Sequence, residues 1–266
     1  MVRKQVAGSR SSLRRPLKVV GIIPARWGST RFPGKSLTEI CGKPLIHWVI
    51  QNAAGARRLD RLLVATDDER IAMAARAAGG EAVMTHADHV SGTDRVAEAL
   101  AVAGVTARVV LNIQGDEPLI EHGLIDALAE VMLRDSSWDM ATAAAPIRDA
   151  EELRNPSLVK VVCDEQGRAL YFSRSVIPYV REAKAVEGAG VAHWGHVGIY
   201  AYRSSFLRRF VRTPPVLLER LECLEQLRAL CMGARILVLK TAHSGRGVDT
   251  PEDVQYVEAL LRERRA

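Results

Sequence analysis

Three positively charged side chains lie close together in a loop that follows a predicted strand. The apolar run 19–23 is rich in valine and isoleucine, which is typical of a strand covered on both faces. We expect Pro24, which has no N–H to donate, to end the regular pairing of this strand. The residues that follow include Arg26, Arg31 and Lys35, among glycines and small hydroxyl side chains. Because glycines let backbone N–H groups approach phosphate oxygens and cations offset the phosphate charge, the loop predicts a nucleoside triphosphate site.

Two other interpretations of this loop can be compared with the phosphate site. A solvated basic turn would place three like charges within ten residues with no acid among them, and like charges repel. A P-loop has four residues between its first glycine and its Gly-Lys pair. Here five residues separate Gly28 from Gly34, and Pro33 removes an N–H where the phosphate cradle needs one. We therefore favour a phosphate site of another kind.

Two carboxylates that lie far apart in the sequence are the best candidates for metal ligands. Asp116 follows the predicted buried strand 108–113, and Asp249 directly precedes the last predicted helix. Mg²⁺ binds one or two carboxylates together with phosphate oxygens and water. Each residue alone also fits a structural role, Asp116 in a turn and Asp249 beside a helix start. Their joint placement with the cationic loop favours a magnesium site that serves the triphosphate.

The candidate residues are distributed over an alternation of strands and helices. Short apolar runs alternate with segments whose apolar residues recur at helical spacing. The further predicted strands are 62–65, 81–84, 108–113 and 140–147, and the predicted helices are 44–57, 68–78, 93–103 and 124–133. This order predicts an α/β fold with a mostly parallel sheet covered on both faces. Because ligands bind at the carboxyl ends of such strands, the loops after residues 23, 65 and 113 should form the site.

The pattern changes after residue 158. Residues 158–174 form two strand-like runs around a turn that contains glycine, which predicts a hairpin, and residues 193–202 add a third extended run. Residues 217–232 have the spacing of one amphipathic helix, and 235–239 that of a strand. Thr250 and the Pro-Glu-Asp sequence after it are typical of a helix start. We predict a single domain, 17–266, with a small antiparallel insert at about 155–215.

Composition and charge limit the classes of function. The chain of 266 residues has a formal net charge of +6, but residues 1–38 carry nine lysines and arginines and no acid. The remainder has 28 basic and 31 acidic residues, which argues against nucleic-acid binding by the body. We expect the basic tail 1–16 to be disordered, and we see no apolar segment long enough to span a membrane. The four cysteines form no metal or disulfide pattern, so we expect a cytoplasmic protein.

Seven motifs in register resemble a known family. The loop signature Arg26-x-x-Ser29-x-Arg31-x-Pro33-Gly34-Lys35 is similar to the opening signature of sugar nucleotidyltransferases, and most closely of the 3-deoxy-D-manno-octulosonate (Kdo) cytidylyltransferases. The other six motifs are Ala65-Thr66-Asp67, Ser91-Gly92-Thr93-Asp94-Arg95, Asn112-Ile113-Gln114-Gly115-Asp116-Glu117-Pro118, Tyr171-Phe172-Ser173-Arg174, His196-Val197-Gly198-Ile199-Tyr200 and Gly247-Val248-Asp249-Thr250-Pro251-Glu252-Asp253. The resemblance runs from about residue 17 to the C-terminus. It implies a Rossmann-like three-layer nucleotidyltransferase fold in which the insert supplies sugar contacts and a homodimer interface.

The resemblance also implies roles for individual residues. It implies Mg²⁺ as the cofactor, held by Asp116 and Asp249. The residues expected to act on the triphosphate in catalysis are Arg26, Arg31 and Lys35. The implied nucleotide-binding residues are Ala25, Arg26, Ser29, Lys35, Ser91, Gly92 and Arg95, and the implied sugar-binding residues are Arg174, His196 and Gln226.

Several of these residues have an equally simple structural explanation. Ser91 and Gly92 fit an ordinary helix start with Arg95 on its first turn. Arg174 fits a surface charge on a hairpin, although a guanidinium matches the planar carboxylate of a sugar acid. A single histidine within a strand, such as His196, is usually a hydrogen-bonded structural residue. These alternatives stay open from the sequence.

The resemblance implies the transfer of a cytidylyl group to Kdo. CTP and Kdo would form CMP-Kdo and diphosphate, which activates Kdo for lipopolysaccharide biosynthesis. A cytidylyltransferase for another acidic sugar, such as a sialic acid, is the nearest alternative, but its usual loop lacks the Phe32-Pro33-Gly34-Lys35 continuation. A nucleotide-binding module without catalysis is a second alternative. Such a module would not require the two carboxylates of a metal site.

Overall fold

The computed structural model describes residues 17–28, 32–182, 191–242 and 247–263, and its central feature is one mixed sheet. Within these residues, nine strands form the sheet, with the order β11-β7-β10-β6-β1-β4-β5 and with β8 and β9 attached to one end of β10. The pairs β6–β1, β1–β4, β4–β5 and β11–β7 are parallel. β10 is antiparallel to both β6 and β7. The predicted α/β fold with a mostly parallel sheet is confirmed.

The elements follow the predicted alternation closely. The strands are β1 (Leu17–Ala25), β2 (Glu39–Ile40), β3 (Lys43–Pro44), β4 (Arg61–Thr66), β5 (Glu81–Met84), β6 (Ala107–Asn112), β7 (Met140–Pro146), β8 (Lys160–Cys163), β9 (Ala169–Ser173), β10 (Trp194–Arg203) and β11 (Ile236–Lys240). The helices are the 3₁₀ turn η1 (Lys35–Leu37), α1 (Leu45–Ala54), α2 (Glu69–Ala77), α3 (Gly92–Val102), α4 (His122–Arg134), α5 (Ala150–Arg154), α6 (Ser204–Phe210), α7 (Leu217–Glu222), α8 (Glu225–Cys231) and α9 (Pro251–Glu263).

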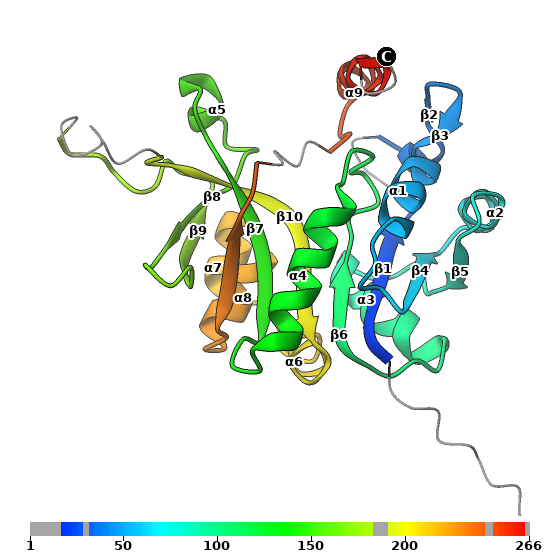
Figure 1. The fold of residues 1–266 in the computed structure, drawn as a ribbon, viewed down its shortest axis with the longest axis horizontal. Helices are drawn as coiled ribbons and strands as arrows, with labels where there is room; N and C mark the ends of the chain where they lie inside the picture. Colours follow the sequence, from blue (N-terminus) through cyan, green and yellow to red (C-terminus); the bar gives the residue numbers. More distant parts are fainter. Residues whose placement is uncertain (1–16, 29–31, 183–190, 243–246, 264–266) are drawn as a thin grey trace, which may run out of the picture.

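Two apolar cores lie on opposite faces of the sheet. One core contains Val19 and Ile23 of β1 together with buried residues of α1, α4 and α9. The other contains Val20 and Ile22 of the same strand together with residues of α3, α6 and α8. Alternate residues of β1 therefore face opposite helical layers, as expected for a strand covered on both sides. Figure 1 shows α1 and α4 in front of the sheet and α6, α7 and α8 behind it.

The expectation that Pro24 ends the pairing of the first strand is wrong. Pro24 pairs in register with Ala65, and β1 continues to Ala25. The carbonyl of Ile22 accepts the Ile113 N–H, so the backbone of Ile22 faces β6. Pro24, two residues further on, faces the same side, where the pairing of β6 with β1 has already ended. The missing N–H therefore removes no ladder hydrogen bond.

The predicted hairpin is confirmed, and its neighbour is a strand of the main sheet. β8 and β9 pair antiparallel, and β8 also pairs with the first residues of β10. The rest of β10 lies between β6 and β7 in the centre of the sheet. The insert at about 155–215 therefore shares a strand with the body. Its bounds as a unit, like the disorder of the tail 1–16 outside the described residues, stay predictions.

The prediction of one continuous helix over 217–232 is wrong. Cys223 adopts a left-handed conformation with φ of 51°, and Leu224 after it is extended, so that α7 ends and α8 begins anew. The break turns Leu224 into the core, where it is 6% exposed. The carbonyls of Glu222 and Cys223, which lose helical partners there, accept hydrogen bonds from Arg174. Arg174, which is distant in the sequence, thus stabilises a helix break that the local apolar spacing does not reveal.

The start of the last helix has the predicted form. The Thr250 N–H donates to Asp253 Oδ2, and the Asp253 N–H donates to Thr250 Oγ1, which closes a reciprocal cap. No helix in the described part of the chain combines the length and apolar character needed to cross a bilayer.

Candidate active site

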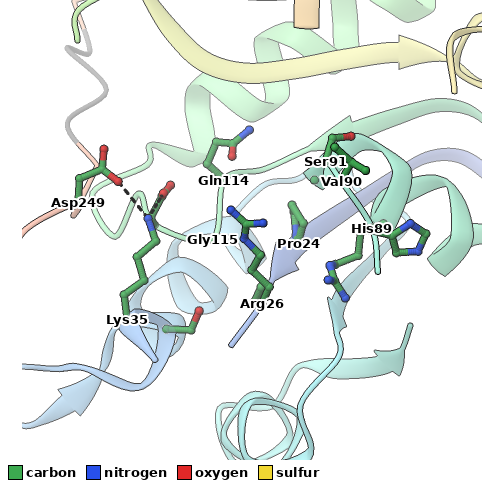
Figure 2. Close-up of a pocket in the computed structure, with 14 residues that line it drawn as sticks. Pro24, Arg26, Lys35, His89, Val90, Ser91, Gln114, Gly115 and Asp249 are labelled. Carbon is green, nitrogen blue, oxygen red and sulfur yellow. Dashed lines mark hydrogen bonds and ion pairs between the residues drawn. The ribbon is translucent and has the colours of Figure 1, made fainter. Parts of the chain in front are cut away.

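A cleft of about 260 Å³ lies at the carboxyl ends of β1 and β6, where the sequence predicts the site. Of the predicted nucleotide and metal residues, it is lined by Ala25, Arg26, Lys35, Ser91, Gly92, Arg95, Asp116 and Asp249. Ser29 and Arg31 lie outside the described residues. Figure 2 shows Lys35 and Asp249 at one end of the cleft and His89 and Ser91 at the other, with Arg26 between them. Segments from the whole length of the chain thus meet in one cavity.

Lys35 connects the first loop to both predicted metal ligands. Its Nζ lies 2.5 Å from Asp116 Oδ2 and 3.2 Å from Asp249 Oδ1, and it also donates to the Val248 carbonyl at 3.3 Å. Burial alone would lower the pKa of Lys35, but the charges and hydrogen bonds of the two carboxylates outweigh it, so the pKa is raised. Lys35 is therefore firmly cationic. Gly34, with φ of 71°, provides the left-handed turn that begins η1 and directs this side chain into the cleft.

Asp116 and Asp249 are brought together by backbone contacts. The Val248 N–H donates to the Asp116 carbonyl at 2.8 Å, which holds the segment before α9 against the loop after β6. The Asp249 N–H is held by Asp253 Oδ2. Carboxylate oxygens from both loops surround a single cationic nitrogen, so the donor set fits a cation that prefers oxygen ligands, such as Mg²⁺. The described residues contain no cluster of three or more His, Cys, Asp or Glu arranged for a metal, so phosphate and water would have to complete the coordination.

The other end of the cleft begins at the N-terminus of α3. Ser91 caps this helix by accepting the Asp94 N–H, as expected for an ordinary helix start. Arg95 is 2% exposed. Its Nη1 donates to Thr85 Oγ1 at 2.6 Å and to the His86 carbonyl at 3.2 Å, and its Nη2 donates to Asp67 Oδ2 at 3.0 Å. Arg95 therefore lines the cleft while it holds the loop before α3 in place.

The cleft also includes residues that the sequence analysis did not assign to the site, namely Pro24, Ser36, His89, Val90, Gln114 and Gly115. Gln114 and Gly115 belong to the motif around Asp116, which could have identified them. A Cβ on Gly115 would lie 2.5 Å from the Pro24 carbonyl oxygen, so only glycine allows the loop after β6 to pass this close to β1. His89 and Val90 lie in a loop with no distinctive motif, and the sequence carries no signal for them.

The three predicted sugar-binding residues do not line this cleft. Arg174 donates from Nε to the Glu222 carbonyl and from Nη1 to the Pro156 carbonyl, so its guanidinium supports the hairpin and the end of α7. Gln226 is 3% exposed, and its Nε2 has no hydrogen-bond partner among the described residues. Gln226 is therefore a buried donor that a ligand could satisfy.

His196 lies on β10 and is neutral. Thr142 Oγ1 donates to the Ile199 carbonyl at 2.7 Å, so it must accept from His196 Nε2, which lies 2.9 Å away. Burial lowers the pKa of His196 to about 3. The ring packs edge-on against Phe172. The structural explanation of His196 thus has direct support, and a sugar contact stays a prediction.

β10 connects these residues to the edge of the cleft. A Cβ on Gly198 would lie 3.6 Å from Gln114 Cγ and equally far from Glu117 Oε1. Burial, with a further contribution from the charge of Asp116, raises the pKa of Glu117 to about 8. Its Oε2 has no partner among the described residues. The strand that carries His196 therefore runs past the cleft, next to a buried carboxyl group with unused hydrogen-bonding capacity.

The chain is similar to known cytidylyltransferases over most of its length. The family model described as "Cytidylyltransferase" matches residues 20–236. A 3-deoxy-manno-octulosonate cytidylyltransferase from Syntrophobacter fumaroxidans is 52% identical over 92% of this chain and 97% of its own length, and one from Bdellovibrio bacteriovorus is 48% identical over 92% and 98%. A solved structure of CMP:2-keto-3-deoxy-manno-octonic acid synthetase complexed with CTP superposes with a TM-score of 0.86, with 42% identity over 93% of this chain and 99% of that one.

Proposed function

Because the chain belongs to the 3-deoxy-manno-octulosonate cytidylyltransferase family, we propose that it joins CTP and Kdo to form CMP-Kdo and diphosphate. One observation carries the proposal beyond family membership. Arg26, Lys35 and the pair Asp116 and Asp249 line the same cleft as the start of α3, which gives one cavity a cationic phosphate end and a second, hydrogen-bonding end. A nucleoside triphosphate requires both ends.

The residues of the cleft can supply what cytidylyl transfer requires. The anomeric hydroxyl of Kdo attacks the α-phosphorus of CTP and releases its proton to solvent, the bond to the bridging oxygen breaks, and diphosphate leaves with the electron pair. Protein catalysis of such a step consists mainly of positioning and of offsetting negative charge. Arg26 and Lys35 provide fixed positive charge for the triphosphate, and the N-terminus of α3 fixes the other end of the nucleotide.

Magnesium is part of the proposal, with Asp116 and Asp249 as its protein ligands. The convergence of both carboxylates on Lys35 Nζ supports a cation site at this point. When bound, Mg²⁺ would offset negative charge on the phosphates. Lys35, which holds both carboxylates in the free protein, would then be available to donate to phosphate oxygens.

The sugar would occupy the side of the cleft next to β10. Glu117 Oε2, which has no partner among the described residues, supports a polar ligand in this region, and Gln226 Nε2 on α8 is a second buried donor without a described partner. His196, as a neutral imidazole, presents Nδ1 as an acceptor. Arg174 uses three of its five N–H groups on backbone carbonyls, so the second N–H of each Nη could still donate to the carboxylate of Kdo.

A homodimer and a cytoplasmic location complete the proposal. Tyr179 of the insert is 86% exposed, and Leu217 and Leu221 of α7 are 62% and 70% exposed. Leu217 and Leu221 lie one turn apart on α7, so their exposure is in keeping with a protein interface on this helix. Sedimentation equilibrium of the wild type and of Leu221→Asp tests it, because a dimer through this surface should dissociate in the variant. An unchanged mass for both would remove the surface from the interface.

The reaction is tested directly by its specificity. Purified protein with Mg²⁺ is given each of four nucleoside triphosphates with a panel of sugar acids that includes Kdo and a sialic acid, and diphosphate release is recorded. We expect release with CTP and Kdo only. Release with CTP and a sialic acid instead would favour the alternative sugar. CTP binding without release under any condition would favour a non-catalytic module.

A further inference from the structure

Asp67 lies between the two ends of the cleft without lining it. It follows β4, and its side chain is 11% exposed. Oδ2 accepts a hydrogen bond from Arg95 Nη2 at 3.0 Å, and Oδ1 accepts the backbone N–H of Trp27 at 3.1 Å. One carboxylate oxygen thus holds Arg95, which lines the cleft, and the other holds Trp27, which directly follows the lining residue Arg26.

The contact with Trp27 extends to the phosphate end. The Trp27 carbonyl accepts the Gly34 N–H at 3.1 Å, and Gly34 directly precedes Lys35. The Arg70 guanidinium stacks on the Trp27 ring at 3.3 Å from its centroid. A Cβ on Gly34 would lie 2.9 Å from Cη2 of this indole, so Gly34 packs directly against the ring. Both peptide groups of Trp27 and its ring are therefore held in place.

The contact with Arg95 extends to the other end. Arg95 holds Thr85 and the His86 carbonyl, and it lies on the first turn of α3, next to Ser91 and Gly92. The contacts form a continuous chain from the start of α3 through Arg95, Asp67, Trp27 and Gly34 to Lys35.

We propose that Asp67 is a positioning residue that fixes the spacing between the α3 end and the phosphate end of the cleft, so that one nucleotide can contact both ends at once. The proposal rests on the proposed function, because it takes CTP as the nucleotide. A ligand that spans two sites binds tightly only when their separation matches its length. A ligand that occupies one end does not depend on this separation.

The isosteric variant Asp67→Asn isolates the proposed role. A carboxamide has one acceptor oxygen, so its NH₂ group must face either the Trp27 N–H or the Arg95 Nη2 donor. Asp126→Asn is the matched control. Asp126 also accepts two backbone N–H groups, one on each oxygen, from Arg57 and Arg58, and it lies on α4 away from the cleft.

Calorimetric titration of both variants with CTP, cytidine and inorganic tripolyphosphate provides the test. We expect Asp67→Asn to bind CTP about tenfold more weakly, which corresponds to about 1.4 kcal/mol, and to bind each fragment less than threefold more weakly. Asp126→Asn should bind CTP as the wild type does. A CTP affinity within twofold of wild type in Asp67→Asn would overturn the proposal, as would an equal loss for CTP and a fragment, or an equal loss in Asp126→Asn.

Two further measurements keep the proposal separate from the proposed function. In the free protein, amide hydrogen exchange at Trp27 should be at least tenfold faster in Asp67→Asn than in the wild type. Unchanged exchange would show that Asp67 does not connect Trp27 to Arg95, whatever reaction the protein catalyses. Asp67→Glu keeps two acceptor oxygens and should bind CTP more tightly than Asp67→Asn, and equal weakness of the two variants would count against the proposal. If the wild type binds CTP but releases no diphosphate with Kdo, the proposed reaction fails, and the positioning role of Asp67 is still tested by CTP binding and hydrogen exchange.

Discussion

Lys35 Nζ lies 2.5 Å from Asp116 Oδ2, so the cation of the first loop already contacts a carboxylate that we propose as a magnesium ligand. The same ammonium group contacts Asp249 at 3.2 Å. In the free protein, Lys35 therefore offsets the charge of two carboxylates that would otherwise repel each other. It also competes with a metal ion for their oxygens until a triphosphate offers it other acceptors.

Lys35→Met should therefore affect metal binding and turnover in opposite directions. Removing the ammonium leaves Asp116 and Asp249 without their cation. In the absence of nucleotide, we therefore expect the variant to bind Mg²⁺ about tenfold more tightly, which corresponds to about 1.4 kcal/mol. Turnover should fall by about a hundredfold or more, because a charge on the triphosphate is lost. Titration calorimetry and diphosphate release measure the two effects. Lys43→Met is the control, since Lys43 lies over Trp48, outside the cleft. Unchanged or weaker Mg²⁺ binding in Lys35→Met would contradict this competition.

Asp116→Asn and Asp249→Asn should each abolish measurable turnover while the protein stays folded. An amide oxygen is a poorer ligand for Mg²⁺ than a carboxylate, and each variant also weakens the hold on Lys35. We expect diphosphate release to fall by about a hundredfold or more, with a melting temperature close to that of Asp126→Asn. A rate near that of the wild type in either variant would remove that residue from the metal site.

The sequence predicts the cleft well because its determinants are local. The loop around Lys35 indicates a phosphate site by its glycines and cations alone. Asp116 indicates a metal ligand because it is an acid that directly follows a buried strand. The alternation of strands and helices then puts both loops at the same edge of the sheet. The motif Ala65-Thr66-Asp67 marks Asp67 in the sequence but does not indicate what its side chain does. Its role depends on Trp27 and Arg95, which lie 40 and 28 residues away, and no spacing in the sequence encodes those contacts.

The errors have the same physical origin. Pro24 breaks a strand only if its missing N–H faces a partner, and that depends on where β6 ends. The helix predicted over 217–232 has the right apolar spacing, but Arg174 stabilises a break near Cys223 by binding carbonyls at the end of α7. Local patterns predict which conformation is favourable in isolation, and tertiary partners decide these two cases.

The buried imidazole of His196 predicts a loss of stability in acid. Burial lowers its pKa to about 3, below the value of about 6.5 in an unfolded chain. Between these values the unfolded state takes up a proton that the folded state does not, so stability falls as the pH drops from 6.5 toward 3. The stability of His196→Gln relative to wild type should therefore improve steadily from pH 7 to pH 4. Urea unfolding across this range measures it, with the exposed His122→Gln as the control. A constant difference for His196→Gln would mean that His196 does not titrate as proposed.

Lys160 lies outside the cleft, and its substitution should lower the stability of the folded protein substantially. Its side chain is fully buried, and Nζ donates to the carbonyls of Asn155, Leu158 and Arg174 at 3.0, 2.8 and 2.7 Å. Burial lowers the pKa of Lys160, and the charge of Arg174 lowers it further, but the three acceptors keep the buried ammonium hydrogen-bonded. Lys160 thereby ties the segment before β8 to the end of β9.

Lys160→Met keeps most of the side-chain volume and removes the ammonium donor from those three carbonyls, of which the Asn155 carbonyl still accepts the Leu158 N–H at 3.2 Å. Because unsatisfied buried polar groups are costly, we expect a loss of about 2–4 kcal/mol in the free energy of unfolding. A loss of this size is a large part of the stability of an ordinary domain. Urea unfolding gives the value, and Lys18→Met, at an exposed position of β1, is the control that should change it by less than about 0.5 kcal/mol. Equal stabilities of the two variants would show that water replaces the ammonium and that Lys160 does not hold the hairpin in place.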